Sequence, residues 1–66
     1  MKNNIKVERA RKNITQAQLA DLISVSRQTI NAMEAGKYVP STVIALRLSK
    51  IFGIEVSAIF ELEPGD

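Results

Sequence analysis

The stretch from Gln16 to Ala35 reads QAQLADLISVSRQTINAMEA, and it decides how the chain folds. The helical spacing of its apolar residues predicts one helix from Gln16 to Ile23 and another from Arg27 to about Ala35. Ser24 and Val25 interrupt this pattern, so the two helices are joined by a tight turn. Helices joined by a turn of about three or four residues cross at roughly 90 to 120°, which holds the second helix steeply against the first.

The residues of this unit have the sizes that such a crossing requires. Ala20 is small where the two backbones approach each other. The residues that fill the angle between the helices are apolar: Leu19, Ile23, Val25, Ile30 and Met33. The outward positions of the second helix are polar or small: Arg27, Gln28, Thr29, Asn31 and Ala32. The second helix therefore presents a face that is able to enter a groove.

Helical patterns also precede and follow this unit. Three more helices are predicted, from Asn3 or Asn4 to near Asn13, from Ser41 to Gly53, and from Val56 to Phe60. The hydroxyl residues suited to capping the middle helices are Thr15, Ser26 and Ser41. Residues 61–63 alternate polar and apolar, as a brief edge strand does. We expect an all-α, five-helix domain over residues 1–66, with its core in 5–60 and a C-terminal tail or edge strand in 61–66.

Composition excludes several classes of function. A chain of 66 residues has room for one small core. It contains neither cysteine nor histidine, which excludes disulfides, zinc sites built on thiolate or imidazole, and catalysis that needs an imidazole. We therefore expect no enzyme, no metal site and no cofactor. No apolar run approaches the roughly 18 to 20 residues of a membrane span, and no apolar signal segment follows the start, so we expect a soluble, cytoplasmic protein without a membrane partner.

Charge is distributed unevenly along the chain. Residues 1–50 hold all nine Lys and Arg against three acidic residues, a net charge of +6, whereas residues 51–66 hold four acidic residues and no basic one. This polarity indicates a basic working face and an acidic end that turns away from a polyanion.

Three short strings of residues carry a family resemblance. They are TQAQLA at residues 15–20, VSRQTIN at 25–31 and EAGKYVPS at 34–41. With them, residues 5–60 resemble the Cro and phage-repressor type of helix-turn-helix DNA-binding regulators, often called XRE-like. The chain is most similar to the short stand-alone members of that family, which implies a five-helix dimer with a small terminal β-sheet that pairs residues 2–4 with 61–63.

The resemblance implies a set of DNA-binding residues: Gln16, Ser26, Arg27, Gln28, Thr29, Asn31, Ala32, Lys37 and Tyr38. The first turn of the second helix points into the major groove. There Arg27 can bond O6 and N7 of guanine and Gln28 can bond N6 and N7 of adenine. Asn31 can meet a base or a phosphate, and Ala32 can offer only a methyl contact to thymine. Gln16 stands at the positive end of a helix, where the family binds a phosphate. Lys37 and Tyr38 either hold the other side of the DNA backbone or form an ordinary loop.

The resemblance also implies a supporting ion pair between Arg9 and Glu34. This pair orients the second helix of the unit and can present Arg9 to a phosphate, at a gain of about 0 to 1 kcal/mol if partly exposed. Other basic residues, Arg47 among them, are interpreted as solvated charges. Alternatively, Arg9 and Glu34 are two unrelated surface charges.

Three residues depart from the family pattern. Ser24 stands where glycine usually supplies a positive φ, so it carries strain of about 1 kcal/mol or the turn differs slightly. Glu8 replaces an apolar residue, so either the first helix is rotated to bury Val7 or its contact with the core is weaker. Glu55 stands where a Ser or Asp cap is expected, which puts the start of the last helix in question.

A single unit of this size contacts too few base pairs to select one site in a genome, so we expect a homodimer. The candidate interface is Ile54, Val56, Ile59, Phe60 and Leu62, with monomer core as the alternative for Ile59 and Phe60. We expect a sequence-specific regulator that binds a palindromic double-stranded DNA operator through residues 27–35 and usually represses, with no small-molecule ligand. The alternative is an antitoxin-like protein-interaction module that binds DNA secondarily, which a free surface at Leu22 or Leu62 would favour. RNA binding is less favoured because no stacking platform is visible.

Overall fold

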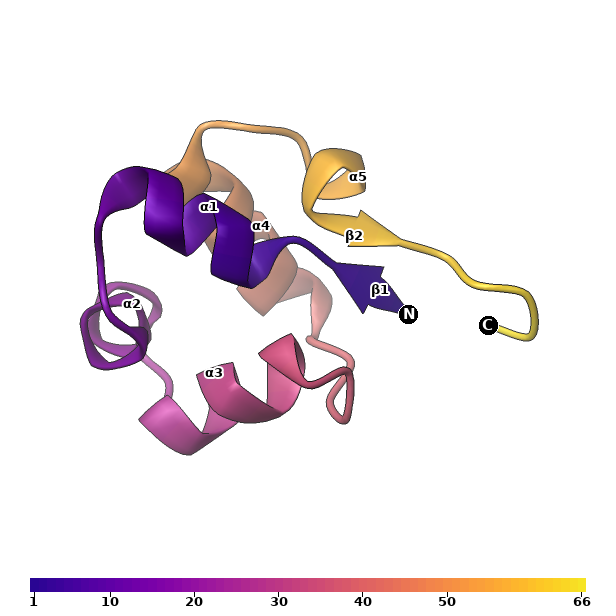
Figure 1. Ribbon diagram of the computed structural model, residues 1–66, viewed down its shortest axis with the longest axis horizontal. Helices are drawn as coiled ribbons and strands as arrows, with labels where there is room; N and C mark the ends of the chain where they lie inside the picture. The colour runs from indigo at the N-terminus through magenta and orange to yellow at the C-terminus, as the bar shows by residue number, and fades with distance from the viewer.

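The computed structural model describes residues 1–66 as five helices and one two-stranded antiparallel sheet (Figure 1). In chain order the elements are β1 (Lys2–Asn3), α1 (Ile5–Lys12), α2 (Gln16–Ile23), α3 (Arg27–Glu34), α4 (Thr42–Phe52), α5 (Val56–Ile59) and β2 (Phe60–Glu61). The predicted five-helix fold with a small terminal sheet is confirmed. The third and fifth helices each end one residue earlier than predicted.

Hydroxyl caps start the three middle helices, as predicted. The backbone N–H of Gln18 donates to Oγ1 of Thr15 at 3.0 Å, that of Thr29 donates to Oγ of Ser26 at 3.1 Å, and Ser41 caps α4 in the same way. The side chain of Gln18 also accepts a hydrogen bond from the backbone N–H of Thr15 at 2.8 Å, which completes a capping box. Because these caps are local, α2 and α3 begin at residues that the sequence alone identifies.

Left-handed residues end the first two helices. Asn13 ends α1 at φ 56°, as predicted, and Ser24 ends α2 at φ 60°. Ser24 therefore does adopt the conformation that glycine usually supplies, so the turn keeps its shape and the serine is strained. Glu55 makes no capping hydrogen bond, yet α5 still forms as a single turn.

The core contains at least one residue from each helix. Its members are Ile5, Leu19, Ala20, Ile23, Ile30, Met33, Leu48, Phe52 and Ile59. All the residues predicted to face inward from α2 and α3 are among them, and Val25 packs against the cluster from the turn. Burial of these side chains fixes the crossing of α2 and α3, at about 25 cal/mol for each Å² of apolar surface removed from water.

Helix α1 faces the core with Glu8 instead of Val7. Glu8 is only 8% exposed, whereas Val7 is 51% exposed, so the predicted alternative of a rotated first helix is wrong. The carboxylate of Glu8 lies 3.5 Å from Nη1 of Arg11, one turn further along the same helix. Rotation would remove Ile5, which is fully buried, from the core, and this explains why the helix keeps its orientation.

The two ends of the chain lie side by side (Figure 1). In the sheet, Lys2 pairs with Glu61 and Asn3 pairs with Phe60. The second strand therefore begins one residue earlier than predicted, and the register differs by two positions from an antiparallel pairing of residues 2–4 with 61–63. The strand begins directly after α5, because the backbone N–H of Asn4 donates to the carbonyl of Ile59 at 2.8 Å and aligns the two segments there. None of the five helices has the length and apolar character that a membrane-spanning helix needs.

Candidate nucleic-acid interface

The first turn of α3 presents free polar side chains. Arg27 and Gln28 are exposed, and neither takes part in the side-chain hydrogen bonds or ion pairs of the chain. Asn31 is also exposed, four residues after Arg27 and hence on the same side of the helix. These three side chains are therefore available to a partner outside the chain.

Two hydroxyl residues of the same turn have structural work as well. Oγ of Ser26 and Oγ1 of Thr29 lie 2.9 Å apart, and Ser26 also caps the helix. A hydroxyl has one donor and two acceptor positions, so each retains some capacity for a further contact. Ala32 is half-buried and presents only a methyl group.

A polar hollow joins α3 to the start of α2. It has a volume of about 160 Å³ and is lined by Gln16, Arg27, Gln28 and Asn31. The backbone N–H groups of the first turn of α2 have no partner within that helix, and they give this end a partial positive charge. The candidate phosphate-binding residue and the candidate base-reading residues therefore border one space.

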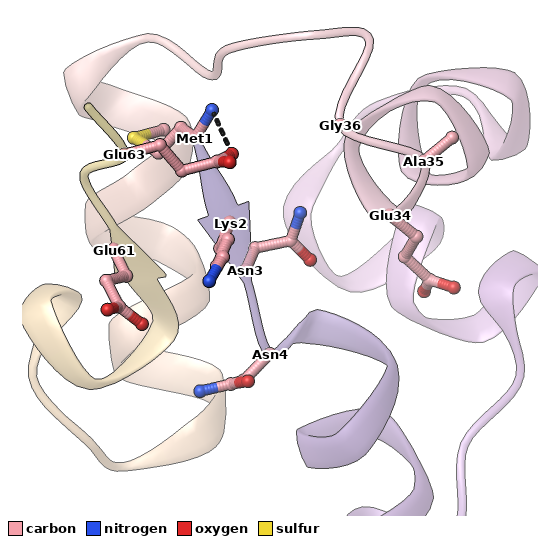
Figure 2. Close-up of a pocket in the computed structure, with 9 residues that line it drawn as sticks. All are labelled: Met1, Lys2, Asn3, Asn4, Glu34, Ala35, Gly36, Glu61 and Glu63. Carbon is pink, nitrogen blue, oxygen red and sulfur yellow. Dashed lines mark ion pairs between the residues drawn. The ribbon is translucent and has the colours of Figure 1, made fainter. Parts of the chain in front are cut away.

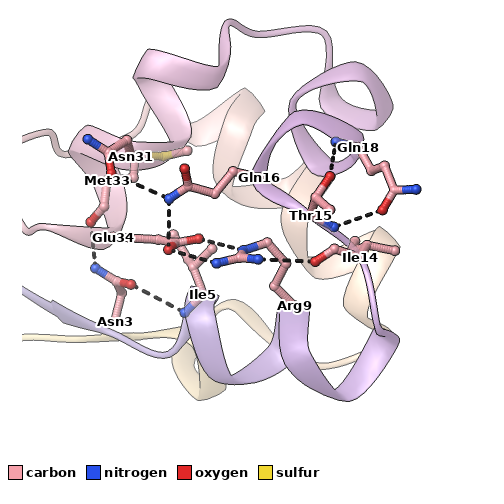
Figure 3. A network of polar contacts seen from close by, with 10 residues as sticks. All are labelled: Asn3, Ile5, Arg9, Ile14, Thr15, Gln16, Gln18, Asn31, Met33 and Glu34. Atoms are coloured by element: carbon pink, nitrogen blue, oxygen red, sulfur yellow. Dashed lines mark hydrogen bonds and ion pairs between the residues drawn. The ribbon is translucent and has the colours of Figure 1, made fainter.

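A network of hydrogen bonds between α1, the start of α2 and the end of α3 supports this arrangement (Figure 3). Nε of Arg9 donates to Oε2 of Glu34 at 2.8 Å, and Nη2 donates to Oε1 at 3.2 Å. Nη1 of Arg9 donates to the carbonyl of Ile14 at 3.1 Å. Nε2 of Gln16 donates to Oε1 of Glu34 at 3.2 Å and to Oδ1 of Asn31 at 3.4 Å. The network thus ties α1, the start of α2 and the end of α3 together.

The ion pair is more enclosed than the sequence predicts. The side chains of Arg9 and Glu34 are 17% and 9% exposed. Hydrogen bonding to the Glu34 carboxylate raises the pKa of the Arg9 guanidinium above its ordinary value. Each of the three guanidinium nitrogens donates one hydrogen bond inside the chain, which leaves two of the five N–H donors, so the presentation of Arg9 to a phosphate stays a prediction.

A family model described as "Helix-turn-helix" matches residues 5–59. The chain belongs to the helix-turn-helix family. The helix-turn-helix unit comprises α2, the turn at residues 24–26, and α3. The resemblance to Cro-type regulators is confirmed, and the chain carries a helix-turn-helix DNA-binding domain of a transcriptional regulator. The family is non-enzymatic, in agreement with the expectation from composition.

Helix-turn-helix proteins of other organisms match nearly the whole chain. An uncharacterized HTH-type transcriptional regulator of Methanocaldococcus jannaschii is 49% identical over 63 residues, covering 96% of each chain. The uncharacterized HTH-type transcriptional regulator YgzD of Bacillus subtilis is 43% identical over 63 residues, again covering 96% of each. A third, from Archaeoglobus fulgidus, is 40% identical over 60 residues, covering 91% of this chain and 84% of its own.

Beyond the helix-turn-helix unit, Lys37 and Tyr38 lie in the loop that follows α3. Gly36 has φ 75° there, which turns the chain away from the helix. Lys37 and Tyr38 are both exposed. The structure therefore leaves both side chains free to meet a partner at the far end of α3.

Two side chains that support the helix-turn-helix unit are not predicted from the sequence. Nη1 of Arg47 donates to the carbonyl of Ile23 at 3.0 Å, so this exposed charge also has a partner within the chain. Nδ2 of Asn3 donates to the carbonyl of Met33 at 2.7 Å. Each binds a carbonyl near the C-terminal end of α2 or α3, where carbonyl groups lack partners within the helix. A basic residue close in sequence to the end of a helix indicates a bond to the last carbonyls of that helix, but Arg47 lies far along the sequence from Ile23.

A second hollow lies beside the sheet and has the opposite character (Figure 2). Its volume is about 390 Å³, and it is lined by Met1, Lys2, Asn3, Asn4, Glu34, Ala35, Gly36, Glu61 and Glu63. The N-terminal ammonium pairs with Glu63 at 3.0 Å and with Asp66 at 3.2 Å, and hydrogen bonds to these carboxylates raise its pKa. Three carboxylates border this hollow, which makes it unsuited to a phosphate.

Proposed function

We propose that the protein is a sequence-specific regulator that inserts α3 into the major groove of an operator. The observation that carries this proposal is the exposed polar face of Arg27, Gln28 and Asn31, which lies beside the N-terminus of α2. Side chains at the start of such a helix reach the base edges when the preceding helix lies across the DNA backbone. The network of Arg9 and Glu34 keeps α3 at the angle that this requires.

Each candidate residue has a role that matches its chemistry. Arg27 bonds O6 and N7 of guanine and Gln28 bonds N6 and N7 of adenine, each giving about 1 to 3 kcal/mol of discrimination. Gln16 and its backbone N–H, at the positive end of α2, bind a phosphate. Lys37 and Tyr38 bind the backbone beyond the other end of α3.

The exposed side of α3 and its cap, residues 26–32, is called the reading face here, and its remaining residues make smaller contributions. Ser26 and Thr29 use the free capacity of their hydroxyls, while Ala32 offers its methyl group to a thymine methyl.

A second copy of the chain completes the recognition of a palindromic operator. The α3 helices of the two copies then read half-sites about 34 to 36 Å apart. The proposed interface is Ile54, Val56, Phe60 and Leu62. Leu62 is 75% exposed and needs a partner most, whereas Ile59 is 1% exposed and belongs to the core, so its assignment to the interface is wrong. The dimer represses transcription by occluding polymerase. It acts in the cytoplasm, the compartment that holds the DNA.

Exposed leucines support a second candidate function. Leu22 is 54% exposed and Leu62 is 75% exposed, and both are available to an antitoxin-like partner. In that case the protein masks another protein and binds DNA secondarily. Copurification of a defined partner, lost in a Leu22→Ala variant that retains DNA binding, would favour this candidate.

Selection from a pool of random DNA duplexes tests the primary proposal. The wild-type protein is expected to enrich one palindromic sequence, and size measurement in solution is expected to give a dimer. Arg27→Ala and Gln28→Ala are expected to lose the preference for particular bases while the thermal unfolding curve stays unchanged.

A matched control distinguishes the loss of a positive charge from the loss of base recognition. Lys6→Ala removes an exposed positive charge on α1, outside the proposed DNA-binding residues, and is expected to keep the wild-type base preference. Gln16→Ala is expected to weaken binding to all sequences in the pool. If the wild-type protein enriched no sequence, or if Arg27→Ala kept the same preference, the proposal would be refuted.

A further inference from the structure

The side chain of Asn3 joins the terminal sheet to the end of α3. Its Nδ2 donates to the carbonyl of Met33, in the last turn of α3, at 2.7 Å (Figure 3). Its Oδ1 accepts from the backbone N–H of Ile5 at 3.2 Å, so the oxygen of the amide faces α1 and the nitrogen faces α3. No other side-chain hydrogen bond or ion pair connects β1 or β2 to α3.

The space between the sheet and the end of α3 is partly open. The hollow of about 390 Å³ is lined by residues 1–4 and two glutamates on the side of the sheet, and by residues 34–36 at the end of α3 (Figure 2). Behind it, Met33 and Ile59 belong to one apolar core. Apolar burial has no preferred direction, whereas a hydrogen bond does. The bond from Asn3 therefore fixes the angle between the sheet and α3 in a way that the core does not.

Asn3 also lies beside the proposed dimer interface. In the antiparallel sheet Asn3 is paired with Phe60. Phe60 and Leu62, which is 75% exposed, are both members of that proposed interface. A second copy that packs on this surface contacts the strand that pairs with Asn3. One step of strand pairing and one side-chain hydrogen bond then lead from the second copy to Met33 in α3.

We propose that Asn3 is a positioning residue that sets the angle of α3 relative to the second copy, and with it the half-site spacing that the dimer accepts. The inference rests on the proposed function, from which it takes the dimer and the insertion of α3 into the major groove. One added base pair moves a half-site by about 3.4 Å and rotates it by about 34 to 36° around the DNA axis. A dimer with a fixed α3 binds such an operator poorly, whereas a dimer with a loosened α3 follows the half-site more easily.

Asn3→Asp removes the bond to α3 with little other change. A carboxylate of nearly the same shape still accepts from the N–H of Ile5, but it has no proton to donate to the carbonyl of Met33. Asn4→Asp is the matched control, because Nδ2 of Asn4 donates to the carbonyl of Ala58 in α5 at 3.2 Å. The control makes the same change of charge at the next residue and removes a bond of the same kind that does not involve α3.

The measured quantity is a ratio of affinities at one fixed salt concentration. Duplex selection identifies the operator, and binding is then compared with operators whose spacer is one base pair longer or shorter. The wild type is expected to bind the altered operators at least about 10-fold more weakly, the ratio that 1.4 kcal/mol gives. Asn3→Asp is expected to reduce this ratio by roughly 2- to 10-fold, the range that one hydrogen bond provides, and to keep the base preference within each half-site.

Asn4→Asp is expected to keep the wild-type ratio. A merely structural role of Asn3 would lower the affinity for all operators alike and leave the ratio unchanged, because the folded fraction cancels in it. If Asn3→Asp does not fold, as judged by circular dichroism, Asn3→Ala and Asn4→Ala are compared in the same way.

The inference is wrong if Asn3→Asp keeps the wild-type ratio, if Asn4→Asp reduces it equally, or if the wild type binds all spacings alike. In each of these cases the wild type still enriches an operator, so the proposed reading of bases by α3 stands. A wild type that enriches no duplex would instead refute the proposed function and this inference with it.

Discussion

Replacing Ser24 with glycine is expected to stabilise the protein. Ser24 has φ 60° and ψ 46°, in the left-handed region where an L-residue is strained by about 1 to 2 kcal/mol. Its side chain is exposed, and its hydroxyl makes no hydrogen bond within the chain. Glycine therefore removes the strain of the Cβ atom without removing any contact.

The gain is smaller than the strain, because glycine also increases the entropy of the unfolded chain. That effect destabilises the fold by about 0.5 to 1 kcal/mol. The net increase in the free energy of unfolding therefore lies between about 0 and 1.5 kcal/mol, with a midpoint of about 0.75 kcal/mol. For a domain of this size, about 1 kcal/mol changes Tm by roughly 4 to 8 °C, so at the midpoint Ser24→Gly is expected to raise Tm by about 3 to 6 °C.

Two matched variants identify the cause. Asn13 has φ 56° at the end of α1, but asparagine tolerates this conformation, so Asn13→Gly is expected to change the free energy by less than about 0.5 kcal/mol. Ser24→Ala keeps the Cβ atom and is expected to give no gain. Urea unfolding and calorimetry measure all three. A decrease in Tm for Ser24→Gly, or an equal gain for Ser24→Ala, would refute the assignment of strain to the backbone.

Three further predictions concern ionisable residues. Glu34→Gln breaks the enclosed ion pair and is expected to lower the free energy of unfolding, measured in urea, by about 1.5 to 3 kcal/mol. As a control, Arg11→Gln, at a side chain that is 72% exposed, is expected to change it by less than about 0.5 kcal/mol, and similar effects of the two variants would contradict the prediction. Glu8→Leu is expected to raise the free energy of unfolding by about 1 kcal/mol, because an apolar side chain is better suited to a position only 8% exposed; a lower Tm would show that the carboxylate stabilises α1. The pKa of Asp66 lies below its ordinary value of 3.8, because the backbone N–H of Glu63 and the N-terminal ammonium both bond its carboxylate. These contacts stabilise the fold above pH 3.8 and are lost as the pH falls, and an NMR titration with a midpoint at or above 3.8 would contradict them.

The sequence predicts those features that depend on neighbouring residues. Helices α2 and α3 begin where Thr15 and Ser26 cap them, because a cap acts within three residues of the chain. It does not predict the bond from Arg47 to the carbonyl of Ile23, or the burial of Glu8, because both depend on segments that meet only after folding. The register of the sheet differs from the predicted one by two positions for the same reason.

The reading face contains two groups of side chains with different structural roles. The side chains of Arg27 and Gln28 make no hydrogen bond or ion pair within the chain, so replacing them is expected to change the proposed base preference at little expense in stability. Ser26 caps α3, and its replacement by alanine lowers stability by about 1 kcal/mol along with any change in binding. Asn31 and Gln16 share a hydrogen bond, so a change at one alters what the other can do. We therefore expect a new operator preference to be reached most readily through residues 27 and 28, whereas a change at Asn31 also removes its hydrogen bond to Gln16.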